Sequence, residues 1–119
     1  MITTLDILYA MRGLLYAPEA WTKGRMARNA DGRPVPVNHP RACRLSLEGA
    51  MYRVAFIQNA RIGPVHELLK SIITPGRYIP LASFNDAEGT THEAILNLLD
   101  KALIKAGGIP PARQIDLDI

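Results

Sequence analysis

The histidines, the residue type most often found as a metal ligand, lie far apart in this sequence. His39, His66 and His92 are about 26 residues apart, so none has a second histidine at the spacing of a zinc ligand pair. His66 and His92, each followed by glutamate, match the first half of a zinc-protease motif, but no histidine follows four residues after either one. The sequence therefore predicts no metal site. It also contains no glycine-rich loop that would hold a phosphate cofactor.

Asp86 and Glu88 are the two acidic residues that could serve as paired carboxylates in the cleft of a small hydrolase or transferase. The segment around them does not keep the register of a calcium-binding loop. We favour a turn in which the side chains of Asn85 and Asp86 bond to nearby backbone. We also expect Cys43 to be buried within an apolar helix, where it would act as a small hydrophobic residue. Catalysis is therefore an alternative, and the main expectation is a non-catalytic protein.

Positive charge gathers in the first half of the chain. Residues 1–61 contain nine Lys/Arg and four Asp/Glu, a net charge of +5, whereas residues 62–119 contain five and seven, a net charge of −2. Such a basic region attracts phosphates, so a nucleic-acid-binding accessory protein is a second alternative. No helix-turn-helix signature accompanies the charge, and a solvated basic face explains it as well. The residues that would contact nucleic acid are Lys23, Arg25, Arg28 and Arg33.

One side of the first predicted helix carries four residues at the spacing i, i+4, i+7 and i+11. Tyrosine and arginine often anchor protein interfaces, because they combine apolar area with polar tips. Two interpretations stay open: this side binds a partner protein, or it packs under the hairpin or the C-terminal tail. The four residues are Leu5, Tyr9, Arg12 and Tyr16.

The elements that must position these residues are mainly helical, because apolar residues recur at helical spacing in four segments. Asp31-Gly32 followed by Pro34 and Pro36 predicts an irregular β-hairpin, since prolines extend the chain but remove ladder donors. We therefore predict a mainly α (α+β) fold, a compact bundle of about four helices with a small β-hairpin at about 22–37. The predicted elements are helices at 4–16, 41–58 and 64–73, a last helix from a Thr90–Glu93 capping box to Gly107-Gly108, strands at about 22–28 and 33–37, and a structured loop at 77–89.

Length and composition favour one folded domain, since the chain has 119 residues of which 48% are hydrophobic. We place this helical domain at 1–108 and an extended tail at 109–119. The single cysteine argues against a disulfide framework and for the reducing cytoplasm. No apolar run reaches the ~20 residues of a membrane span, so we expect no membrane partner. Three methionines and short apolar patches are compatible with a homodimer, although no heptad repeat supports one.

Two segments together resemble a family of small uncharacterised proteins, a domain of unknown function found in bacterial, phage and prophage genomes. One segment contains Gly49-Ala50 and Arg53, and the other runs from Phe84 through Asn85-Asp86 and Thr91-His-Glu93 to Leu99-Asp100. The family usually has tryptophan where this chain has Phe84. The resemblance implies a shared scaffold and no particular reaction. The positions to which it assigns a structural role are Trp21, Gly24, Gly49, Phe84, Asn85, Asp86, Thr91 and Glu93.

These observations lead to one main hypothesis, a small non-catalytic cytoplasmic interaction protein. The resemblance adds that it is phage- or prophage-encoded and acts by binding a host protein. The predicted binding residues are those of the first helix, and the sequence does not identify the protein partner.

Overall fold

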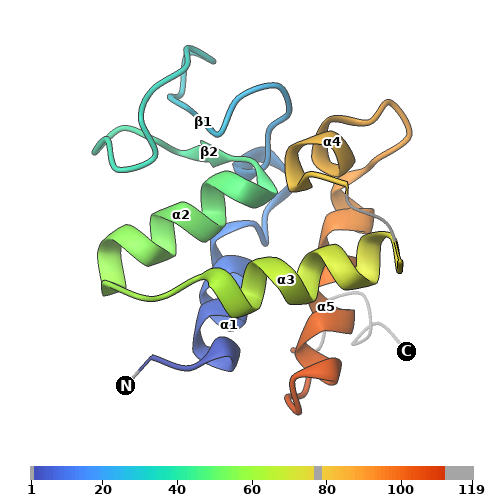
Figure 1. Cartoon of the computed structure of the whole chain (residues 1–119). Helices are drawn as coiled ribbons and strands as arrows, with labels where there is room; N and C mark the ends of the chain where they lie inside the picture. The colour runs from blue at the N-terminus through green and yellow to red at the C-terminus, as the bar shows by residue number, and fades with distance from the viewer. Residues whose placement is uncertain (1, 77–78, 112–119) are drawn as a thin grey trace, which may run out of the picture.

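Five α-helices, a short 3₁₀ helix and a two-stranded sheet make up this computed structural model, which describes residues 2–76 and 79–111 (Figure 1). The mainly helical fold with a small antiparallel sheet confirms the predicted fold class. The predicted tail, 109–119, is described only as far as Pro111, and its remainder lies outside the described residues. In chain order the elements are α1 (Thr4–Leu14), η1 (Pro18–Ala20), β1 (Ala27–Arg28), β2 (Arg44–Leu45), α2 (Leu47–Gln58), α3 (Gly63–Ile73), α4 (Leu81–Asp86) and α5 (His92–Lys105).

Helix α1 begins where the sequence predicts, and its first turn is closed by a reciprocal capping box. Thr3 Oγ1 accepts a hydrogen bond from Asp6 N at 3.1 Å, and Asp6 Oδ2 accepts one from Thr3 N at 2.9 Å. The bond from the Thr3 backbone is the main reason that the pKa of Asp6 lies below its ordinary value. The opposite side of the helix is apolar and fully buried through Ile7, Leu8 and Met11.

The sheet joins two segments whose paired residues lie 16 and 18 positions apart in the sequence. Ala27 pairs with Leu45 and Arg28 with Arg44, in antiparallel register. The predicted second strand at 33–37 is therefore wrong, although the chain does return beside β1 there: Arg28 and Pro34 form an isolated bridge, and Val35 N donates to Ala27 O. Proline has no N–H, so this segment cannot complete a ladder. Residues 44–45 pair with the opposite edge of β1, where Arg28 O accepts from Cys43 N and Met26 O accepts from Ser46 N.

Helix α2 starts at Leu47, six residues later than predicted. Ser46 caps it by accepting a hydrogen bond from Gly49 N at 2.9 Å. The residues before Ser46 are drawn into the sheet, which overrides their helical spacing. Cys43 consequently lies in extended chain and is exposed, so the predicted burial of this thiol is wrong.

The remaining helices lie where the sequence predicts helical or loop structure, but one capping residue differs from the prediction. Helix α3 matches the predicted 64–73, and the loop predicted at 77–89 contains α4. Thr91 caps α5 by accepting from Ala94 N at 3.1 Å, so the predicted Thr90–Glu93 capping box is wrong. Thr90 is buried and instead donates to Phe84 O at 2.7 Å. Gly107, at a φ of +92°, ends the helix with bonds from Gly107 N to Ile104 O and from Gly108 N to Leu103 O, which confirms the glycine cap.

One apolar core receives buried side chains from all five helices. Helix α3 crosses in front of α1 and α5, while α4 and the sheet close one end of the bundle (Figure 1). Within the described residues, no helix is of the length and apolarity that crossing a membrane requires. The largest fully buried side chains are Ile7, Leu8, Met11, Leu15, Leu47, Met51, Leu69, Leu81, Ile95, Leu99, Leu103 and Val54.

Candidate binding surface

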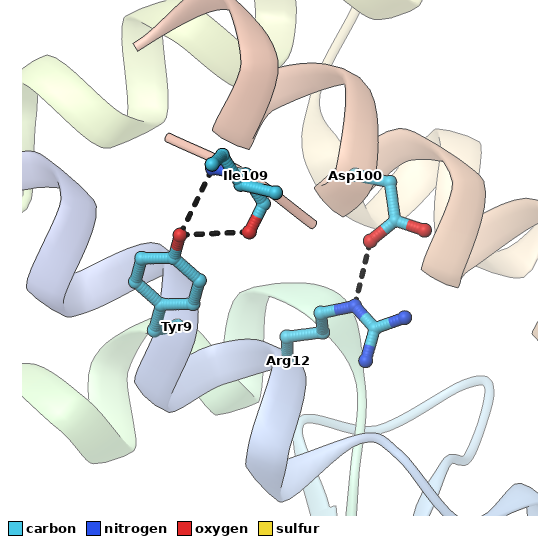
Figure 2. A network of polar contacts seen from close by, with 4 residues as sticks. All are labelled: Tyr9, Arg12, Asp100 and Ile109. Atoms are coloured by element: carbon cyan, nitrogen blue, oxygen red, sulfur yellow. Dashed lines mark hydrogen bonds and ion pairs between the residues drawn. The ribbon is translucent and has the colours of Figure 1, made fainter. Parts of the chain in front are cut away.

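The predicted interface side of α1 lies against the segment that follows α5. Tyr9 Oη donates to Ile109 O at 2.8 Å and accepts from Ile109 N at 3.0 Å (Figure 2). Gly108 also approaches this side so closely that an added Cβ would lie 2.7 Å from Leu5 Cδ2. The chain after α5 therefore lies over Leu5 and binds the hydroxyl of Tyr9, as in the alternative that placed the tail there.

Arg12 uses its charge within the protein. Its Nε donates to Asp100 Oδ1 at 2.6 Å, which ties α1 to α5 (Figure 2). Arg12 is 3% exposed, and its Cζ lies 5.9 Å from the centre of the Tyr16 ring. Among the described residues, Arg12 Nη2 has no hydrogen-bond partner. Of the four predicted interface residues, only Tyr9 and Tyr16 are substantially exposed, at 39% and 45%.

Asn85 is the centre of the motif that carries the family resemblance. It is fully buried, and its Oδ1 accepts from Trp21 Nε1 at 2.7 Å and from Leu47 N at 3.0 Å. Its Nδ2 donates to Thr22 O at 3.1 Å and to Asp86 Oδ1 at 2.8 Å. One amide side chain thus joins α4, the start of α2 and the segment after η1.

Asp86 completes this network through one of its carboxylate oxygens. Its Oδ1 accepts from Gly24 N at 2.9 Å as well as from Asn85. Gly24 has a φ of +84°, a conformation that favours glycine. Glu88 is exposed in the next turn. A small hollow of about 110 Å³ does lie beside Asp86, with Glu48 as its other acidic residue.

The other residues of the family motif have structural contacts. Gly49 passes under β1 so closely that a Cβ would overlap with Met26 O. Phe84 is half-buried against the core, and its carbonyl accepts the bond from Thr90. Thr91 caps α5, and Glu93 is exposed in the first turn of that helix. The structure thus brings the motif together around α4, where it holds loops in place.

Only two of the four predicted nucleic-acid contacts have side chains free for a ligand. Arg28 donates to Thr22 Oγ1, Gly32 O and Lys23 O at 2.9–3.1 Å. Lys23 Nζ donates to Ala87 O at 2.7 Å and lies 5.5 Å from the centre of the Trp21 ring. Arg25 and Arg33 are exposed, and no hydrogen bond of either side chain occurs within the described part of the chain.

The cations around the sheet lack acidic partners. Residues 21–61 contain eight Lys/Arg and two Asp/Glu, a net charge of +6. Across residues 2–76 and 79–111, the ion pairs that involve described residues do not include any lysine or arginine of this segment. Arg53, for example, binds the carbonyl oxygens of Val37 and His39. The side chains of Lys23, Arg28 and Arg53 are thus positioned by neutral oxygens, which carry no formal charge to balance theirs.

An open hollow along α2, which the sequence did not predict, lies within this basic region. Met26, Tyr52 and Phe56 line it and are 45%, 42% and 64% exposed, and its volume is about 620 Å³. Val37, Asn38, Glu48 and Ala55 complete its walls. We call this hollow the α2 groove. The sequence signal that could have indicated it is that α2 is apolar on too much of its circumference for one small core to cover.

A second hollow of about 300 Å³ adjoins the α2 groove and shares Met26 and Val37 with it. Arg25 and the chain from Pro34 to Pro36 form its remaining walls together with Ala27. A cation therefore lies beside the apolar surface of the α2 groove. In the described part of the chain, no three His, Cys, Asp or Glu side chains come together to hold a metal ion.

The model of a family of unknown function (DUF6197) matches residues 1–104. This range includes both strands and every described helix, with α5 as far as Ile104. The Asn85 network and the α2 groove both lie within it. No curated protein and no solved structure matches the chain.

Proposed function

The chain belongs to this family of unknown function, and we propose that it is a small, non-catalytic protein that binds an acidic segment of another protein in the α2 groove. The observation that carries the proposal is the exposure of three large apolar side chains, Met26, Tyr52 and Phe56, around one hollow. Exposed apolar side chains gathered in a patch mark interaction sites, and Met, Tyr and Phe are enriched in interfaces.

The charge around the α2 groove indicates the kind of partner. The segment that forms the sheet and α2 has a net charge of +6, with no acidic partner for its cations among the described residues. An acidic ligand would supply those partners and would be attracted from a distance. Arg25, which lines the adjoining second hollow, is the cation we expect to meet it.

The side of α1 that the sequence favoured is the weaker candidate. Tyr9 and Leu5 already contact residues 108–109, and Arg12 is paired with Asp100. A partner that used this side would have to displace these internal contacts. The α2 groove requires no such displacement.

The alternatives of nucleic-acid binding and catalysis receive less support. Arg28 and Lys23 are held by carbonyl and hydroxyl oxygens, so only Arg25 and Arg33 of the four residues predicted to contact a nucleic acid have side chains without such bonds among the described residues. Asp86 accepts two hydrogen bonds within the family motif, which leaves less of its carboxylate for an acid or base role. A phage or prophage origin and a place in the cytoplasm belong to this proposal and rest on the resemblance and the single cysteine.

Site-specific photocrosslinking in the natural host tests the proposal. We expect a photoreactive phenylalanine analogue at position 56 to form a protein adduct whose crosslinked peptide is acidic. The same analogue at position 104 is the control, because Ile104 is 62% exposed on α5 and lies outside the α2 groove. Nuclease-sensitive adducts, or equal adducts at both positions, would contradict the proposal.

A further inference from the structure

We infer that the segment bound in the α2 groove is an acidic amphipathic α-helix. This inference rests on the proposed function and adds the conformation of the partner. A protein segment can dock either as an added β-strand, through backbone hydrogen bonds, or as a helix, through side chains that enter a groove. An added strand requires free backbone donors and acceptors along the groove, whereas a helix requires apolar side chains that line it.

The chain from residue 34 to 37, which lines the second hollow and reaches the α2 groove at Val37, cannot support an added strand. Val35 N donates to Ala27 O, so the N–H of residue 35 points toward β1. In an extended chain the neighbouring residues direct their N–H groups to the opposite, outer side. Those neighbours are Pro34 and Pro36, which have no N–H. This outer edge therefore lacks the donors of a ladder, and Val37 O is already bonded to Arg53.

The α2 side of the groove suits a helix. Tyr52 and Phe56 are four residues apart on α2, so they project from the same side on successive turns. Met26 and Val37 line the α2 groove with them. A helix that lies along such a groove inserts apolar side chains at i, i+3 or i+4, and i+7. Its remaining positions face solvent or the charged rim.

The rim determines which charges the helix carries. Glu48 is the one charged residue among the described residues that line the α2 groove. Arg25 lines the adjoining hollow and also the smaller hollow beside Glu48 and Asp86, and Arg53 donates to Val37 O. The segment as a whole retains its net charge of +6. A helix with acidic residues beside its apolar stripe would therefore be attracted, and a basic helix would be repelled.

A second copy of this chain fits the α2 groove less well. A two-fold dimer would bring the same surface of each copy together. Two segments of charge +6 would then face each other, which opposes association. This argument favours a different, acidic partner over a homodimer.

Fluorescence polarisation with defined peptides and the full chain tests the inference. The probe is a labelled acidic peptide of about 18 residues, with leucine and phenylalanine at helical spacing and a staple on its polar face, long enough to form a helix. The comparison peptide has the same length and net charge, but two central prolines prevent it from forming a helix. We expect the stapled probe to bind at least about tenfold more tightly, and Phe56→Ala to weaken its binding about tenfold or more.

Matched variants and other ligands decide between the outcomes. Ile104→Ala and Lys105→Glu, on α5, should leave binding unchanged, whereas Arg25→Glu should weaken it several-fold. Equal binding of the proline peptide would overturn the helix and leave the proposed function standing. Binding of neither peptide would overturn the inference, and the photocrosslinking result would then decide the proposed function separately. Preferential binding of a single-stranded oligonucleotide, or a dimer at the working concentration that buries position 56, would overturn both.

Discussion

Asn85 shows how one residue can hold a family motif together without chemistry. Its amide makes four hydrogen bonds, to Trp21, Leu47, Thr22 and Asp86, in a site where water is excluded. A buried network in which every group is satisfied fixes a unique arrangement of loops. The sequence predicted that Asn85 and Asp86 form a turn, but not that Trp21 and Leu47 would meet them, because those residues are distant in the chain.

We predict that Asn85→Asp lowers the free energy of unfolding by about 2–4 kcal/mol at pH 7. The substitution keeps the shape but replaces the donor Nδ2 by an acceptor, which leaves Thr22 O and Asp86 Oδ1 without a donor. Urea denaturation measures the change. Asn38→Asp is the control, since Asn38 is exposed in a loop, and it should change stability by less than about 0.5 kcal/mol. Equal stability of both variants would refute the central role of Asn85.

Gly49→Ala should destabilise the protein by about 2–4 kcal/mol, because the new methyl group would overlap with Met26 O. Alanine in place of a helical glycine normally stabilises a protein by up to about 1 kcal/mol. Gly13→Ala in α1 is the matched control, since a Cβ there meets no atom within 4 Å, and it should show that normal gain. Thermal unfolding of the two variants shows whether each substitution raises or lowers the stability. A gain in stability from both would contradict the close approach of α2 and β1.

At the scale of elements, the sequence predicted the helices and caps that depend on neighbouring residues. It did not predict the features that depend on pairing between distant residues. Helices α1 and α3 and the glycine cap of α5 follow from local spacing and caps, and they were found as predicted. The start of α2 was not, because Arg44 and Leu45 pair with residues 16 and 18 positions earlier. Nothing near Ser46 in the sequence indicates that pairing.

The capping box of α1 gives a prediction about pH. The pKa of Asp6 is lowered in the folded protein, so its charge stabilises the fold above the ordinary pKa of 3.8, and this contribution is lost as the pH falls through the folded pKa. Asp6→Asn should therefore lower the Tm at pH 7 and have little effect below about pH 3. Asp31→Asn, at an exposed loop position, is the control and should have little effect at either pH. A Tm difference that persists unchanged in acid would contradict the capping contribution of the charge.

At the scale of the whole molecule, charge and apolar exposure coincide on the sheet and α2. The uneven charge was predicted from the sequence, but the α2 groove was not. The exposure of Tyr52 and Phe56 depends on how β1 and the chain from residue 34 to 37 are placed relative to α2. Hydrophobic periodicity within α2 alone cannot predict that placement. Among the residues predicted on this side of the first helix, Tyr9 contacts the chain after α5 and Arg12 is paired with Asp100 of α5, whereas Tyr16 is exposed.

Because the α2 groove combines apolar and charged contacts, we predict that binding of the stapled acidic probe weakens several-fold between about 0.05 and 0.5 M NaCl without being abolished. In Arg25→Glu, salt should reduce the affinity for the probe by a smaller factor than in the unchanged protein. In Phe56→Ala, the affinity that remains at high salt should be lower. Titrations at several salt concentrations separate the two contributions. Complete loss of binding at high salt would indicate contacts with charge alone, as expected for nucleic acid.

The most direct test of the α2 groove as the binding surface is a map of amide chemical shifts by NMR as the stapled acidic probe is added to the full chain. We predict the largest changes at Met26, Val37, Tyr52 and Phe56, with small changes at Tyr9 on α1 and at Tyr16 just after it. Changes concentrated on α1, or spread evenly over the basic residues, would contradict the assignment of the α2 groove as the binding surface.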